Sequence, residues 1–214
     1  MKKNITIIAY MALICAVQVQ AQMSVNAGYS SARIKANGQR VYWQSGVFGG
    51  LSYNVALGGK FGIAPGAYVN IAENSGTSND GYTFTYTKYR EISANIPLHL
   101  TFRIDLAEGA SLYAFAGPEL NCGISAQNSG YTASTFAKPT GGHQTHTYDY
   151  YNAASVGADD QLRRVNVSGM AGIGVRNRYS NFMLGVERTL MNCRASDAVN
   201  ESYLRLFLGA GIMF

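Results

Sequence analysis

Eight ionisable side chains share one parity along alternating segments of the chain and are the first candidates for chemistry. They are Glu91, His99, Arg103, Glu119, Arg164, Arg176, Glu187 and Arg205. If the apolar residues between them face lipid, all eight face a common interior, where an unpaired charge costs several kcal/mol. The mixed signs therefore predict a salt-bridge plug, with Glu187 and Arg205 at similar depth and Glu119 at a comparable level. An acid–base or ion-conducting site is the alternative.

His99 beside Glu119 or Glu187 would supply the base of a Ser/His/acid set in a lipid-modifying barrel enzyme. Such a set requires a nucleophile within about 3.2 Å of its base, at a place that lipid can reach. The sequence contains no GxSxG-like motif, and His99 has interior parity. We therefore predict no catalytic residue and no enzymatic activity.

A second pair of histidines lies in a long polar segment. His143 and His146 have HxxH spacing, with Asp149 nearby. A zinc site requires three or four ligands held in fixed positions, and nothing in this segment fixes three. The sequence predicts no metal site and no cofactor.

The same segment, residues 126–161, carries five aromatic side chains among many Ser, Thr and Gly residues. They are Tyr131, Phe136, Tyr148, Tyr150 and Tyr151. Tyr, Ser, Gly and Asn make up adaptable binding surfaces, so these aromatics are candidates for binding an extracellular or envelope protein. The alternative is a solvated loop whose aromatics rest on the rim of the fold.

The elements that position these residues are long strands, best seen in residues 91–104. Every even position there is apolar, from Ile92 to Ile104, and almost every odd position is polar, from Glu91 to Arg103. This period of two indicates a strand. At 14 residues it is far longer than the usual strand of about 5–6 residues, and is long enough to cross a bilayer.

Seven further segments show the same period, although some only weakly. They are residues 23–33, 46–57, 60–73, 111–125, 165–176, 180–191 and 203–214. The connections alternate in length: short near 57–59, 105–109 and 177–180, and long at 34–45, 74–88, 126–161 and 192–200. Short periplasmic turns and long extracellular loops are typical of outer-membrane barrels.

These patterns predict an all-β fold: an eight-stranded antiparallel up-and-down transmembrane β-barrel. A sheet in hydrocarbon must close because unpaired backbone groups find no water there. A soluble lipocalin-like cup is the competing architecture and would turn its apolar face inward. Strand length, alternating connections and the terminal aromatic Phe214 favour the membrane.

The start of the chain predicts export. Lys2 and Lys3 precede an apolar run from Ile5 to Val17, which is shorter than the roughly 20 residues of a membrane-spanning helix. We expect a signal peptide over residues 1–21 and a barrel domain over 22–214, located in the cell outer membrane with its lipid as a partner. The net charge of +5 is not clustered on any helix face, so nucleic acid is excluded as a partner.

Three residues leave alternatives open. Cys122 and Cys193 could form a disulfide in an oxidising compartment, but two separate buried thiols are favoured. Arg188 has lipid-facing parity. Either it lies near the outer interface, where lipid phosphates could meet it, or a bulge reverses the parity there. In the second case the interior position of Glu187 would be in doubt.

Two short motifs carry a family resemblance. Residues 96–100 (IPLHL), followed after one short turn by residues 116–120 (AGPEL), resemble the paired central strands of PorT-like outer-membrane barrel proteins. Residues 165–187, with the core GMAGIGV at 169–175, resemble their next hairpin. The resemblance implies an outer-membrane location. The protein after which the PorT-like family is named is associated with a secretion apparatus.

Two functions follow from the predicted fold. The first is a non-catalytic integral outer-membrane barrel with a structural or surface-interaction role and a lumen plugged by side chains. The second is a narrow channel for ions or small solutes. An eight-stranded barrel has just enough interior for side chains to fill, which favours the first.

Overall fold

The computed structural model describes residues 21–36, 40–79, 83–106, 109–134, 144–158, 160–196 and 200–214. Of the expected signal peptide only Ala21 falls among the described residues, and it is the first residue of the first strand. Cleavage of the signal peptide therefore stays a prediction.

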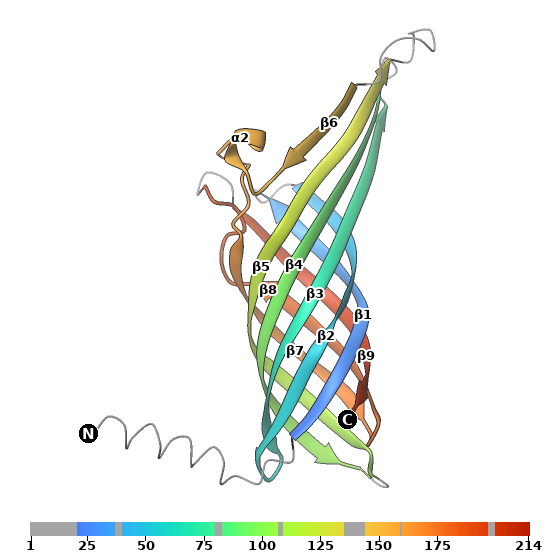
Figure 1. Ribbon diagram of the computed structural model, residues 1–214, viewed down its shortest axis with the longest axis vertical. Coiled ribbons are helices and arrows are strands. Elements are labelled where there is room, and N and C mark those ends of the chain that lie inside the picture. The colour runs from blue at the N-terminus through green and yellow to red at the C-terminus, as the bar shows by residue number, and fades with distance from the viewer. Residues whose placement is uncertain are drawn as a thin grey trace, which may run out of the picture.

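The described chain forms nine strands and one short helix (Figure 1). They are β1 (Ala21–Ala36), β2 (Arg40–Gly58), β3 (Phe61–Asn79), β4 (Thr83–Asp105), β5 (Ser111–Ser134), β6 (Gln144–Asp149), α2 (Ala153–Val156), β7 (Val165–Arg176), β8 (Ser180–Thr189) and β9 (Glu201–Met213). All strands except β6 form a closed antiparallel ring, because β4 pairs with β5 and β1 pairs with β9. The fold is the predicted eight-stranded barrel.

The two ends of the ring meet in one long seam. β1 and β9 pair without interruption from Ser24 opposite Met213 to Ala36 opposite Glu201. The seam removes the last free edge, as a sheet in hydrocarbon requires. No helix among the described residues is long and apolar enough to span a membrane.

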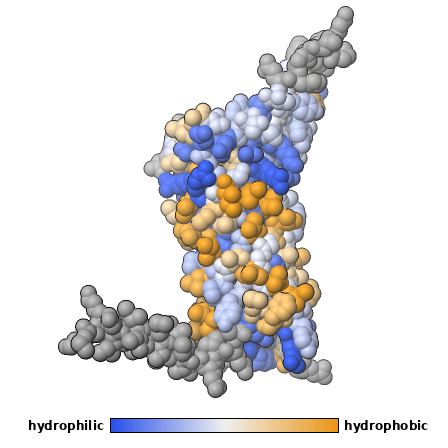
Figure 2. Space-filling view, in the orientation of Figure 1, coloured by the Kyte–Doolittle hydropathy of each residue, from blue (hydrophilic) through white to orange (hydrophobic). Residues whose placement is uncertain are grey.

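The apolar face of the barrel points outward. On β4, Ile96, Leu98 and Leu100 are about half exposed, while Asn95 and Pro97, which have the opposite parity, are buried. Figure 2 shows hydrophobic side chains gathered along the middle of the visible face, with hydrophilic residues above and below them. This is the lipid-facing arrangement, and the soluble cup is excluded.

Several strands are longer than predicted and continue beyond the barrel. The expected loop at 74–88 is mostly a hairpin, in which Asn74 opposite Tyr89 to Asn79 opposite Phe84 extend the pairing of β3 and β4. The expected loop at 126–161 holds the outer part of β5, strand β6 and α2. We call residues 74–79, 83–90, 126–134 and 144–149 the protruding sheet; it rises past the other strands in Figure 1.

Local backbone irregularities set the remaining geometry. Gly58, Gly59 and Gly109 have positive φ in the short turns, a conformation that glycine adopts without strain. A bulge in the pairing of β4 and β5 lies next to Ile124. It reverses the parity of β5 beyond that point, so that Ala126 faces inward and is fully buried.

Candidate functional site: the barrel interior and its extracellular mouth

A buried ion pair crosses the middle of the lumen. Glu187 on β8 and Arg205 on β9 are register partners, and Arg205 Nη1 lies 2.7 Å from Glu187 Oε2. Glu187 Oε1 also accepts hydrogen bonds from Ser168 Oγ at 2.7 Å, Tyr203 OH at 2.5 Å and Asn121 Nδ2 at 3.3 Å. The carboxylate, 1% exposed, is thus held by donors from three strands.

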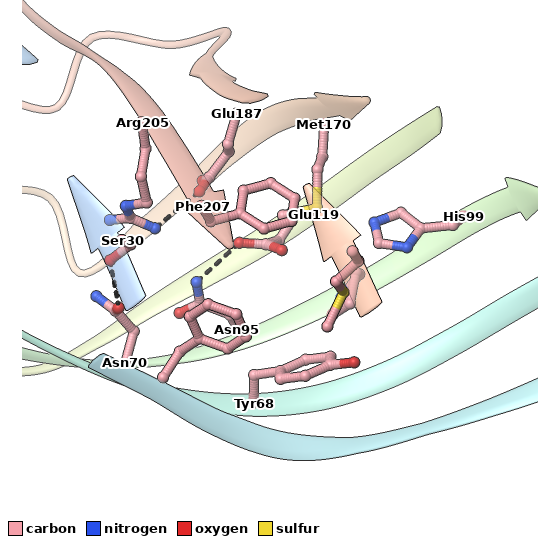
Figure 3. Close-up of a pocket in the computed structure, with 13 residues that line it drawn as sticks. Ser30, Tyr68, Asn70, Asn95, His99, Glu119, Met170, Glu187, Arg205 and Phe207 are labelled. Carbon is pink, nitrogen blue, oxygen red and sulfur yellow. Dashed lines mark hydrogen bonds and ion pairs between the residues drawn. The ribbon is translucent and has the colours of Figure 1, made fainter. Parts of the chain in front are cut away.

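Glu119 lies in the same layer but has a different partner. Its Oε1 accepts a hydrogen bond from Asn95 Nδ2 at 2.7 Å, and the residue is 2% exposed. Figure 3 shows Glu119 and Glu187 beside one cavity, with Arg205 bonded to Glu187. In the described part of the chain this layer sets two carboxylates against one arginine, so the charges at this depth do not balance.

His99 borders the same cavity without joining an acid–base pair. Its ring packs against Phe115, with centroids 5.0 Å apart, and its Nε2 has no hydrogen-bond partner among the described residues. The described chain also contains no cluster of three side chains that could hold a metal. The geometry supplies no relay from His99 to Glu119 or Glu187.

The other charges of the predicted cluster lie at the two ends of the lumen. Arg103 and Arg176 line a cavity of about 430 Å³ at the periplasmic mouth. There Arg103 Nε lies 2.9 Å from Asp105 Oδ1, and Arg176 Nε donates to Ser111 Oγ at 3.2 Å. The expectation that they join a common plug is corrected: the lumen is longer than one side-chain layer.

Two more residues of the cluster lie at the extracellular mouth. Glu91 accepts hydrogen bonds from Tyr89 OH at 3.2 Å and Tyr151 OH at 3.3 Å. Arg164 is exposed on the rim, with its guanidinium 4.8 Å from the centre of the Tyr151 ring. Arg164 precedes β7, so strand parity does not govern where its side chain points, and its assignment to the interior is corrected.

An aromatic layer, absent from the sequence expectations, crosses the lumen beside the ion pair. Phe48, Tyr68, Phe115 and Phe207 come from four different strands. Phe207 lies 6.1 Å from Phe48 and 6.2 Å from Phe115 between ring centroids, and Phe48 lies 6.1 Å from Tyr68. These four residues are the aromatic layer.

Each phenylalanine of this layer lies over a glycine directly opposite it on the next strand. The pairs are Phe48 with Gly28, Phe115 with Gly172, and Phe207 with Gly185. A Cβ atom at any of these glycines would overlap the ring. An inward glycine facing an inward aromatic is the sequence signal that could have found the layer, because such pairs recur in curved sheets.

The interior is divided into small voids between two wide mouths. Three cavities of about 60, 50 and 50 Å³ follow one another through the barrel. The aromatic layer contributes to the walls of the first two, and Arg205 lies between the last two. Each void has room for a few water molecules at most.

Tyr151 closes the extracellular mouth from above. It is 7% exposed and packs with Ala126, Leu162 and Cys193. A Cβ atom at Gly123 would overlap its hydroxyl group. Burial, and then the nearby charge of Glu91, raise the pKa of Tyr151, so it remains a neutral hydrogen-bond donor.

The remaining loop aromatics are divided among several environments. Tyr150 is half-buried and packs edge-on against Tyr89, with centroids 5.6 Å apart. Tyr131 and Tyr148 are exposed on the protruding sheet, and Phe136 lies outside the described residues. The expectation of one shared binding surface is corrected, because Tyr150 and Tyr151 turn into the mouth.

A second ion pair, which the sequence did not suggest, lies at the extracellular mouth. Arg194, between β8 and β9, has Nη2 2.7 Å from Glu201 Oε2. Glu201 Oε1 also accepts from Tyr42 OH at 3.4 Å. The pair borders a cavity of about 250 Å³ between the protruding sheet and the mouth.

Cys122 and Cys193 are free and lie in different places. Cys193 is buried in the mouth cluster with Tyr151 and Leu162. Burial, followed by the charges of Glu201 and Glu91, raises the pKa of Cys193 to about 12. The structure thus has the separate thiols that the sequence favoured.

The protruding sheet has an open edge at β6, which among the described residues pairs with β5 alone. Tyr150 N donates to Ala126 O at 2.8 Å. Because hydrogen-bonded pairs alternate along antiparallel strands, the backbone groups of Thr145, Thr147 and Asp149 point away from β5. Asp149 N donates to Ser155 Oγ at 2.9 Å. The outward backbone groups of Thr145 and Thr147 remain at the open edge of the sheet.

Comparison with known proteins gives similar chains among solved outer-membrane proteins. Ail of Yersinia pestis has 16% identity and a TM-score of 0.43 over 91% of this chain and 99% of its own. Neisserial surface protein A has 13% identity and a TM-score of 0.43 over 90% and 97%. OprG of Pseudomonas aeruginosa has 10% identity and a TM-score of 0.35 over 91% and 96%.

No curated protein matches the chain. The family model described as the outer membrane protein beta-barrel domain matches residues 16–190. That range takes in β1 to β8, and all of these strands except β6 form, together with β9, the closed ring whose apolar face points outward. The chain therefore belongs to the outer membrane protein beta-barrel domain family.

Proposed function

We propose that this protein is a non-catalytic surface-interaction barrel. In this proposal the lumen stays closed, and the protruding sheet binds an extended segment of an extracellular or envelope protein. The open edge of β6 is the observation that carries it. In the described part of the chain no strand lies beyond the backbone groups of Thr145 and Thr147, and an extended peptide can add to such an edge.

The division of the lumen supports the closed state. A hydrated ion would have to pass voids of about 50 Å³ and the aromatic layer. Both mid-depth carboxylates also have partners, since Glu187 pairs with Arg205 and Glu119 accepts a hydrogen bond from the neutral Asn95. These contacts support a structural plug.

A narrow channel is the second candidate, and the two mouths favour it. Cavities of about 430 and 250 Å³ open toward the two sides of the membrane, and Glu119 has no basic partner among the described ion pairs. Planar-bilayer recording decides between the two candidates. The plug requires that the wild-type barrel remain silent, whereas steady, large single-channel conductance would establish the channel.

A pair of proline variants tests the edge. Thr147→Pro removes an outward N–H, so it blocks strand addition while leaving the pairing of β6 with β5 in place. The matched control His146→Pro removes a hydrogen bond to β5 instead. A photo-crosslinking residue at Thr145 should capture a protein on intact cells, and Thr147→Pro should abolish this capture. Unchanged capture in Thr147→Pro would refute the edge as the binding site.

Two further proposals concern the ends and relatives of the chain. Removal of residues 1–21 would leave Gln22 as the first residue, which N-terminal sequencing of the membrane-extracted protein checks. Membership of the PorT-like group rests on the motifs at 96–100 and 116–120. A secretion role would require loss of a secreted protein when the chain is deleted.

A further inference from the structure

The apolar outward face ends at one level on several strands, and a charge follows. On β1 and β8 that charge is Arg33 and Arg188; on β3 and β4 it is Glu73 and Arg90. Pairing of β8 with β7 and β9 continues in register through Arg188. No bulge reverses the parity, so Arg188 faces outward and Glu187 inward.

The two halves of this level differ in how their charges are compensated. Glu73 pairs with Arg90 at 3.3 Å and with Lys88 at 3.0 Å. No carboxylate among the described residues pairs with Arg33, Lys35 or Arg188. The half with Glu73, Lys88 and Arg90 has a net charge of +1, and the half with Arg33, Lys35 and Arg188 has a net charge of +3.

Strand register places these three charges together. Arg33 and Arg188 lie on either side of Leu204, with which both are paired. Adjacent strands lie about 4.8 Å apart, so the two backbones are about 10 Å apart and their long side chains can reach one ligand. Lys35 follows Arg33 on the same face, and all three residues are exposed. We call Arg33, Lys35 and Arg188 the basic patch.

We propose that the basic patch binds the phosphate groups of an outer-leaflet lipid. The patch borders the lipid-facing surface, where Leu204 is 45% exposed, so the ligand must carry both acyl chains and an anionic headgroup. Arginine donates paired hydrogen bonds to phosphate, and basic residues at a membrane surface attract anionic lipid. This site is separate from the β6 edge and does not depend on the proposed partner.

Trp43 makes the proposal measurable. It is the only tryptophan of the chain, is 61% exposed and is the register partner of Arg33. In phosphatidylcholine nanodiscs, energy transfer from Trp43 to dansyl-labelled diphosphoryl lipid A reports lipid at the patch. The same labelled lipid without its phosphates is the reference.

The wild-type barrel should select the phosphorylated lipid, and R33Q/R188Q should weaken this selection about fivefold for each charge removed. The matched control K88Q/R90Q also removes two cations, but from the half of this level where Glu73 offsets part of the positive charge, and should change the selection less than twofold. R33K/R188K keeps the charge and should retain most binding, and the heat-modifiable gel shift verifies folding of each variant. Three results would overturn the proposal. They are equal losses of selection in both glutamine variants, equal energy transfer to the dephosphorylated lipid, and full competition by millimolar inorganic phosphate.

Discussion

Two arginine–glutamate pairs of nearly identical geometry lie at different depths of the barrel. Arg205–Glu187 and Arg194–Glu201 both have an N–O separation of 2.7 Å, and both arginine side chains are 11% exposed. The first joins register partners on β8 and β9 within the membrane. The second joins the connection between those strands to the first residue of β9.

The difference shows that the surroundings of a pair decide what it stabilises. Around Glu187, donors from β5, β7 and β9 converge on fixed backbones. Around Glu201, one partner is a loop residue that can move into water. We therefore expect the inner pair to control barrel stability and the outer pair to control access to the mouth.

The largest effect should be the protection of Cys193 beneath the outer pair. With a pKa of about 12, its thiol is almost fully protonated at pH 8, which lowers the reactive thiolate by about a thousandfold relative to an ordinary cysteine. Maleimide labelling of folded Cys122→Ser barrels should be correspondingly slow and should accelerate as the pH rises. Rapid labelling at pH 8, before urea is added, would show that the mouth is open.

Removal of Arg205 should produce the next largest change. Arg205→Ala leaves Glu187 buried without its cation, so the free energy of unfolding should fall by about 3–5 kcal/mol. Urea titration of the reconstituted barrel measures the change. The double variant Glu187→Gln/Arg205→Met should recover part of the loss, because it also removes the stranded charge. Wild-type stability in Arg205→Ala would mean that the neutral donors alone hold Glu187.

A substitution beside the aromatic layer tests whether the inner pair lies in a tightly packed interior. Gly185→Ala places a Cβ against Phe207 and should destabilise the barrel by about 1–3 kcal/mol. Gly49→Ala is the matched control, because its Cβ would meet only Asn26 O at 3.8 Å. The same urea titration compares them, and equal midpoints would indicate a loose interior.

The outer pair should have the smallest effect on stability. Arg194→Ala frees a loop whose ends can still be solvated, so the free energy of unfolding should change by about 1 kcal/mol. Labelling of Cys193 should nevertheless accelerate in Arg194→Ala, while Arg205→Ala should leave it slow as long as the barrel stays folded. A reversed pattern would exchange the roles assigned to the two pairs.

The barrel was predictable wherever one side of a strand meets lipid. Residues 91–104 alternate because Ile96 and Leu98 face hydrocarbon and Asn95 faces the interior. The protruding sheet gave a weaker signal. On β4, Thr85 and Thr87 alternate there with Phe84 and Tyr86, but residues 74–79 of β3 are all polar or glycine. On β3 the period-two pattern therefore ended before the strand did.

The interior was predictable in part, for reasons of register. Counting residues from the turns placed Glu187 and Arg205 at one depth, and they are partners. Counting could not find the hydrogen bond that Asn95 donates to Glu119, because a neutral amide and a carboxylate have no opposite charges that would mark them as partners in the sequence. Nor could it place Tyr151, whose position depends on a loop that folds back over the mouth.

The seam between β1 and β9 also constrains how the molecule is made. It pairs Ser24 with Met213, residues from opposite ends of the described chain, and contacts of such high sequence separation form slowly. Until it forms, two strand edges have unpaired backbone groups that hydrocarbon does not tolerate. We therefore expect closure of the seam between β1 and β9 to be coupled to insertion of the barrel into the membrane.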